Sequence, residues 1–240
     1  MARHNVLGFT AMLIIVSSLS AGAQDPQVVC VDPGHPSEIN PGFTKQNGTT
    51  ETHIDWVVAK KLEKLLEHKG FRVVMTKSSE NQLVRNRDRA LTANRAGAAI
   101  MVRLHCDSST SRGYALYYPD RTGTKEGVIG PSAKVRTQSR QAAVCLAAEM
   151  QRVLAGHLPN AGVKGDSQTF IGGRQGALTG SIFSKVPVVT IEMVVLNNRV
   201  DAAFIKSADG QDKMAWAIAS GIARYLSVGA KSDDMPDPQQ

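Results

Sequence analysis

The 240-residue sequence is poor in cysteine and aromatic residues, and its longest apolar stretch is too short to cross a membrane. With 42% hydrophobic and 20% charged residues, the composition is that of a soluble globular protein. It excludes a chain disordered throughout and a polytopic membrane protein. Cys30, Cys106 and Cys145 are odd in number and lack C-x-x-C spacing, so they form no disulfide framework. Each lies among aliphatic residues, so we expect buried thiols, with one bridge as the alternative.

The apolar stretch at the N-terminus has the pattern of a secretory signal peptide. Arg3 precedes the apolar run 6–19, and the small residues of the segment 21–23 follow it as an A-x-A-like cleavage site. Gly8 and Thr10, with three serines, interrupt the run, which disfavours a membrane anchor. We therefore expect a signal peptide over residues 1–23, export from the cytoplasm, and no integral membrane segment. The net charge of +7 suits an anionic partner but is a weak argument.

Strand-like and helix-like patterns alternate along the rest of the chain. Short β-branched runs predict strands, and apolar residues at helical spacing predict helices. The strands are expected at 28–31, 71–76, 98–104, 113–118 and 186–195, and the helices at 51–69, 86–96, 133–154 and 211–226. This order predicts a single α/β domain over residues 24–230, with a twisted, mostly parallel sheet and helices on both faces.

Three further segments have weaker patterns. Residues 119–131, rich in glycine, threonine and charge, are expected to form a loop or insertion. The glycine-rich segment 170–180 lacks the spacing of a phosphate-binding loop and is expected to form turns. Residues 231–240 contain aspartate and proline but few apolar residues, and they are expected to be a disordered tail.

Four polar side chains stand at positions where such a fold would gather them. His35 follows the first strand and its Asp32-Pro33-Gly34 turn, Glu51 opens a helix, and His105 ends another strand. Parallel strands end at one edge of the sheet, where ligands bind. Glu192 is the one charge in an apolar strand, where burial without a partner would cost several kcal/mol. Two histidines and one carboxylate form the set that binds catalytic Zn²⁺, and a second carboxylate can then act as general base.

Neighbouring residues offer alternative zinc ligands. Glu38 or His53 could replace Glu51, although residues 51 and 53 lie about 200° apart on a helix, so only one of them faces the site. Cys106 follows His105, but side chains alternate along a strand, which disfavours both as ligands of one metal.

Three other polar residues near predicted element ends are explained by roles other than zinc binding. Asp32 either orients His35 by accepting its ring N–H or caps the turn that follows it. His68 lies in the last turn of a predicted helix, where the helix dipole favours it, and His157 is expected in a solvated loop.

Five segments in order carry a more specific signal. They are Val29–His35 (VCVDPGH), Glu51 before a helix, Leu83–Asn94 (LVRNRDRALTAN), Ile100–Ser108 (IMVRLHCDS) and Val188–Asn197 (VVTIEMVVLN). Over nearly all of residues 24–240, their order and spacing resemble the signatures of the zinc-dependent N-acetylmuramoyl-L-alanine amidases with a twisted-sheet α/β fold.

The resemblance implies a hydrolase that cuts the amide between N-acetylmuramic acid and the L-alanine of peptidoglycan. It implies His35, Glu51 and His105 as ligands of Zn²⁺ and Glu192 as the catalytic residue. The expected partner is peptidoglycan and not nucleic acid, the expected state is a monomer, and a protein activator is left open. The expected location is the periplasm or cell envelope, or outside the cell.

The sequence departs from the family pattern at three places. Pro36-Ser37-Glu38 replaces the usual glycines after the first histidine, Cys106 and Asp107 replace a small residue and asparagine, and Met193-Val194 replaces Gly-Phe. Two other functions stay open: a zinc peptidase acting on the stem peptide, and a non-catalytic module that binds peptidoglycan.

Overall fold

The computed structural model describes Met1 and residues 25–233. The predicted signal peptide, apart from Met1, and residues 234–240 of the predicted tail lie outside the described residues. Within the described ranges, no helix is both long and apolar enough to cross a membrane.

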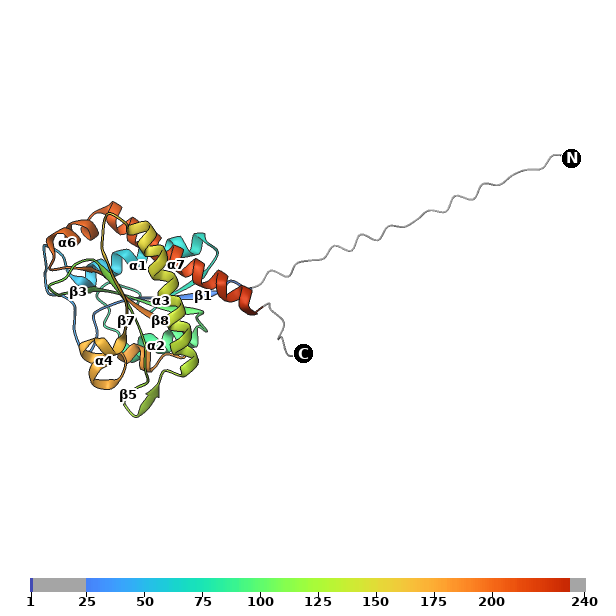
Figure 1. The fold of residues 1–240 in the computed structure, drawn as a ribbon, viewed down its shortest axis with the longest axis horizontal. Helices are drawn as coiled ribbons and strands as arrows, with labels where there is room; N and C mark the ends of the chain where they lie inside the picture. Colours follow the sequence, from blue (N-terminus) through green and yellow to red (C-terminus); the bar gives the residue numbers. More distant parts are fainter. Residues whose placement is uncertain (2–24, 234–240) are drawn as a thin grey trace.

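The described chain forms one α/β domain built on a six-stranded sheet (Figure 1). The strands of this sheet are β1 (Val28–Pro33), β2 (Arg72–Met75), β3 (Ile100–Asp107), β4 (Tyr114–Tyr118), β7 (Asn160–Gly165) and β8 (Val188–Val195). The main helices are α1 (Glu51–His68), α2 (Asn86–Arg95), α3 (Ala133–Leu154), α6 (Arg199–Lys206) and α7 (Ala208–Asp233). The strand order is β2-β1-β3-β8-β4-β7, and only the β8–β4 pair is antiparallel. The predicted single, mostly parallel α/β domain is confirmed.

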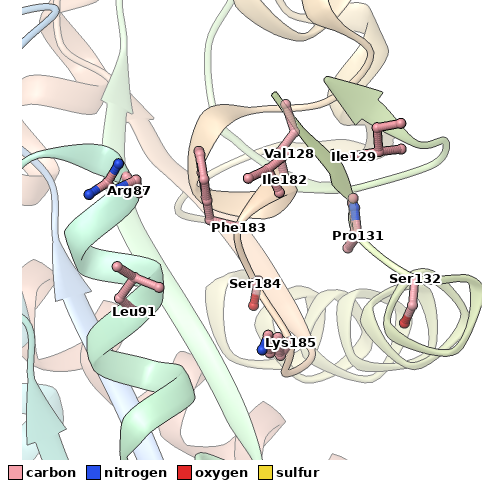
Figure 2. A pocket seen from close by; sticks show the side chains of 11 residues that line it. Arg87, Leu91, Val128, Ile129, Pro131, Ser132, Ile182, Phe183, Ser184 and Lys185 are labelled. Carbon is pink, nitrogen blue, oxygen red and sulfur yellow. The ribbon is translucent and has the colours of Figure 1, made fainter. Parts of the chain in front are cut away.

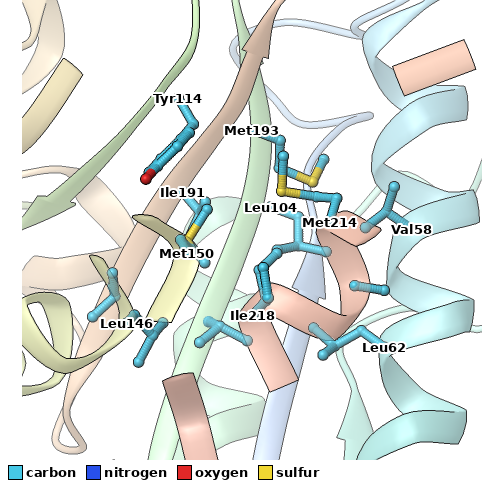
Figure 3. Packing of buried hydrophobic residues seen from close by; sticks show 14 of the residues in the cluster. Val58, Leu62, Leu104, Tyr114, Leu146, Met150, Ile191, Met193, Met214 and Ile218 are labelled. Atoms are coloured by element: carbon cyan, nitrogen blue, oxygen red, sulfur yellow. The ribbon is translucent and has the colours of Figure 1, made fainter. Parts of the chain in front are cut away.

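One face of the sheet carries the large hydrophobic core, which α1, α3 and α7 cover. In β3, Val102 and Leu104 point to this face and are fully buried. Figure 3 shows how Leu62 of α1, Met150 of α3 and Ile218 of α7 pack over the sheet. The apolar residues of α1 recur every four positions, and the Thr50 side chain caps the helix by accepting the backbone N–H of residue 53. The core therefore fixes the start of α1 against the sheet.

The opposite face carries polar side chains in cross-strand rows, next to a smaller apolar cluster under α2. The register aligns Asp32 of β1 with Arg103 of β3, Arg103 with Thr190 of β8, and Thr190 with Tyr117 of β4. We call these four residues the polar row. One step further along the strands, His105 is aligned with Glu192 and Glu192 with Ala115. Because side chains alternate along a strand, both rows lie on the same face.

The structure also corrects several expectations. Residues 119–131 contain a hairpin, β5 (Gly123–Lys125) and β6 (Val128–Gly130), and residues 170–180 contain the short helices α4 (Phe170–Gln175) and α5 (Thr179–Ile182). Strand β7 and helix α6 were not predicted. Helix α7 continues to Asp233, so residues 231–233 are helical and do not belong to a disordered tail. All three cysteines are free, as expected; Cys30 and Cys106 are buried, whereas Cys145 is only partly buried.

A hollow of about 520 Å³ separates this hairpin from α2 (Figure 2). Its lining includes Val128 and Ile129 of the hairpin, Leu91 of α2, and Phe183. None of His35, Glu51, His105 and Glu192 lines this hollow.

Candidate metal centre

His35 lies in a tight loop directly after β1. Its backbone adopts a positive φ of 42°, and its ring Nδ1 is 2.8 Å from the carbonyl oxygen of Asn40. When Nδ1 donates to this carbonyl, Nε2 is left as the metal-binding nitrogen. Gly34 lets the loop approach the sheet, because a Cβ there would lie 2.6 Å from both Asp55 Oδ2 and His105 Cε1. The local sequence thus aims Nε2 of His35 at the edge of the sheet.

Two buried cations hold the backbone of this loop. Lys77 donates through its Nζ to the carbonyl oxygens of residues 34 and 35, and Arg89 donates to those of residues 33 and 36. Side chains of other elements therefore bind the four consecutive carbonyl groups of residues 33–36. Burial, and then the charge of Arg89, lower the pKa of Lys77 to about 8. The sequence analysis did not assign either residue a part in the site.

Glu51 connects the two histidines. Its Oε1 lies 3.0 Å from Nε2 of His35 and 3.0 Å from Nδ1 of His105, and it accepts the backbone N–H of Cys106 at 3.1 Å. Burial by itself would raise the pKa of Glu51, but its close polar contacts with His105 and then with His35 outweigh burial and lower the pKa to about 2. The carboxylate is therefore ionised at neutral pH, as a metal ligand must be.

Among the described residues, these three side chains form the group able to share a metal ion. Each offers one ligand atom, and the three atoms lie within 4.8 Å of one another. The imidazole rings of His35 and His105 meet edge to face, with centroids 5.0 Å apart. Burial lowers the pKa of His105 to about 4, so its ring is neutral at pH 7. Two imidazoles and one carboxylate are the donor set of a catalytic zinc site, and the residues fit that ion.

Glu192 faces the same cavity as the two histidines. The cavity has a volume of about 260 Å³, and its polar lining includes His35, Arg103, His105, Tyr117, Thr190 and Glu192. The Oε2 atom of Glu192 is buried and has no hydrogen-bond partner among the described residues. Burial raises the pKa of Glu192 well above its usual range, and the carboxylates of Glu51 and Asp107 raise it further. Glu192 thus brings a buried, unpartnered carboxyl oxygen to the cavity that His35 and His105 line.

The alternative ligands lie elsewhere. Glu38 accepts the backbone N–H of Asn86 at 2.9 Å, and His53 is exposed and lies 3.2 Å from Glu80. The thiol of Cys106 points to the core side of β3, where it lies 3.6 Å from Oδ1 of the buried Asp55.

His68 and His157 are also exposed and outside the cluster. His68 lies in the last turn of α1, as predicted. His157 stacks at a tilt on Phe204, with ring centroids 5.7 Å apart.

Both explanations of Asp32 were wrong. Asp32 is fully buried, and its carboxylate accepts hydrogen bonds from Arg89 Nη1 at 2.7 Å, from Arg103 Nε at 2.8 Å, and from Thr76. Its carboxylate makes no hydrogen bond to the His35 ring or to the backbone of the turn. The reason is strand geometry, because Asp32 is still within β1 and its side chain points into the polar row.

An α/β domain with a His-Glu-His cluster at the carboxyl edge of its sheet, and a further carboxylate beside it, has the construction of a metal-dependent hydrolase. The chain belongs to the N-acetylmuramoyl-L-alanine amidase family, whose model matches residues 29–224. It is therefore a hydrolase of this amidase class, and its substrate class is peptidoglycan.

Named relatives agree with this assignment. The chain is 25% identical to the N-acetylmuramoyl-L-alanine amidase Rv3717 of Mycobacterium tuberculosis, with 89% of this chain and 93% of that protein covered. Its fold is similar to that of apo Ami1 from Mycobacterium abscessus (TM-score 0.69, 21% identity, 83% of this chain and 98% of the other). It is also similar to CwlD of Clostridioides difficile, solved in complex with the GerS lipoprotein (TM-score 0.63, 23% identity, 84% and 99%).

Proposed function

We propose that this protein is an exported zinc amidase that cleaves the bond between N-acetylmuramic acid and L-alanine in peptidoglycan, with His35, Glu51 and His105 as zinc ligands and Glu192 as general base. The observation that carries the proposal is the convergence of three ligand atoms within 4.8 Å beside a cavity that also contains Glu192. Membership of the amidase family indicates which bond is cut.

The residues divide the chemistry between them. When bound, zinc polarises the scissile carbonyl and lowers the pKa of its water toward about 7. Glu192 accepts a proton from the attacking water and passes it to the departing alanine nitrogen, so no covalent bond to the enzyme is needed. Lys77 and Arg89 keep His35 in place through the loop backbone.

Export and partners follow from the substrate. Peptidoglycan lies outside the cytoplasm, and the signal-peptide pattern of residues 1–23 supports export to the periplasm or cell envelope, or to the outside of the cell. We propose a monomer whose macromolecular substrate is peptidoglycan and not nucleic acid. CwlD was solved with a lipoprotein, which supports testing this chain for a protein activator as well.

Mass spectrometry of the products released from purified peptidoglycan tests the reaction. We expect stem peptides with a free L-alanine amine, and we expect their release to stop when a chelator is added and to return with zinc. Shortened peptides would instead identify a zinc peptidase. Binding to peptidoglycan without any released product would identify a binding module, and either result would overturn the proposal.

Replacing His105 with alanine tests the ligand set. We expect the variant to lose both zinc and activity, because only His35 and Glu51 would remain and catalytic zinc sites use three protein ligands. Zinc content per chain, measured by inductively coupled plasma mass spectrometry after dialysis, is the readout. His53→Ala is the matched control and should keep zinc. Stoichiometric zinc in His105→Ala would show that the ligand set is wrong.

A further inference from the structure

Beside the metal cluster, the cavity contains polar groups that the proposed chemistry does not use. Arg103 and Thr190 are aligned neighbours on β3 and β8, and both line the cavity together with Glu192. Both are buried, with 3% and 4% of their surfaces exposed. The Thr190 hydroxyl has no hydrogen-bond partner among the described residues. A buried hydroxyl without a partner costs free energy, so its presence points to a ligand.

One guanidinium nitrogen of Arg103 makes no hydrogen bond to a described residue. Its Nε donates to Asp32 at 2.8 Å and its Nη2 donates to Asn86 Oδ1 at 2.7 Å. No hydrogen bond from Nη1 to any described residue is present. Gly180 of α5 lies against the guanidinium, because a Cβ there would be 2.7 Å from Nη1 and 2.8 Å from Cζ. These contacts hold the guanidinium rigidly while leaving donor capacity at Nη1.

Arg103 shares its paired carboxylate with a second guanidinium group. Asp32 is shared between Arg89 and Arg103, so one carboxylate faces two guanidinium groups. Asp166 is also buried and close enough to sense Arg103, but its carboxylate accepts the backbone N–H of Leu178 at 3.1 Å. Glu192 makes no hydrogen bond to Arg103. Neither Asp166 nor Glu192 bonds to Nη1 of Arg103, so this nitrogen can still bind an acceptor from a ligand.

We propose that Arg103 and Thr190 form a subsite for a carboxylate of the substrate's stem peptide. The proposal rests on the proposed function. Guanidinium and hydroxyl donors at a buried site match the acceptors of a carboxylate. The amide-linked lactyl group and the sugars of the glycan strand carry no free carboxylate, so the ligand belongs to the peptide. The subsite then orients the leaving peptide on the side of the cavity where Glu192 returns the proton.

Two soluble substrates that differ only in their carboxyl groups test the subsite. N-acetylmuramoyl-L-alanyl-D-glutamate has two free carboxylates, and its diamide has a carboxamide in place of each. For the wild-type chain we expect kcat/KM to be about tenfold or more higher for the acid, mainly through KM. Arg103→Lys keeps a cation near Asp32 but removes the planar guanidinium group. We expect the preference for the acid over the amide to fall to about threefold or less.

Thr190→Val is the second variant and does not disturb the ion pairs of Asp32 with Arg89 and Arg103. The hydroxyl has no protein partner to lose, so the variant should fold, and we expect KM for the acid to rise while KM for the amide stays unchanged. Arg95→Lys and Thr124→Val change the same residue types at exposed positions and should leave the preference unaltered. A preference that stays the same in both Arg103→Lys and Thr190→Val would overturn the subsite.

Binding provides a readout that does not need turnover. In zinc-loaded Glu192→Gln, calorimetry should show tighter binding of L-alanyl-D-glutamate than of its diamide, and Thr190→Val added to this variant should reduce the difference. Equal affinity for the two dipeptides would refute the subsite even if the amidase activity is established. If the protein cleaves neither the muropeptides nor whole peptidoglycan, the proposed function itself is refuted.

Discussion

Replacing Glu192 with glutamine is expected to lower kcat by about 10²- to 10⁴-fold while the protein keeps about one zinc per chain. Glutamine has nearly the same shape as glutamate but cannot accept the proton of the attacking water. Glu192 does not belong to the group of three ligand atoms, so the metal should remain. Release of peptide from a soluble muropeptide gives kcat, and elemental analysis of the same sample gives the zinc content.

Glu67→Gln is the matched control for this substitution. Glu67 is exposed on α1, so neither kcat nor zinc content should change. Normal activity in Glu192→Gln would remove the residue from the mechanism. Loss of zinc in the same variant would instead make Glu192 a ligand, and the division between binding and chemistry would have to be redrawn.

The position of the site could be predicted from the sequence because it depends on strand ends. His35 and His105 each follow an apolar run, and parallel strands bring their ends to one edge whatever the details of packing. Glu192 was recognisable as a lone charge in an apolar strand, and the register places it directly beside His105. Glu51 was recognisable as the first residue of a strongly periodic helix.

Other features depend on contacts that the local sequence does not encode. Lys77 supports the His35 loop across 42 residues, and no spacing in the sequence connects the two. Strand β7 (NAGVKG) has little apolar alternation, and it exists because its backbone pairs with β4. The role of Asp32 was misassigned because the sequence suggested a turn where the strand still continues, so the direction of its side chain was unknown.

Replacing Asp32 with asparagine is expected to destabilise the fold by about 3–5 kcal/mol, because Arg89 and Arg103 would stay buried without their shared counter-charge. Urea unfolding at pH 7 measures the loss. Asp209→Asn, which removes an exposed carboxylate paired with Lys213, is the control and should leave the urea midpoint unchanged.

The difference between wild type and Asp32→Asn should also depend on pH in a defined direction. Burial would raise the pKa of Asp32, but Arg89, Arg103 and the Thr76 hydrogen bond lower it well below its usual range. The folded state therefore binds this proton more weakly than the unfolded state, whose pKa is about 3.9. The stabilisation is fully present above that pKa and is lost as the pH falls toward the folded pKa. A stability difference that is small at pH 7, or that grows on acidification, would show that Asp32 does not hold the two arginines together.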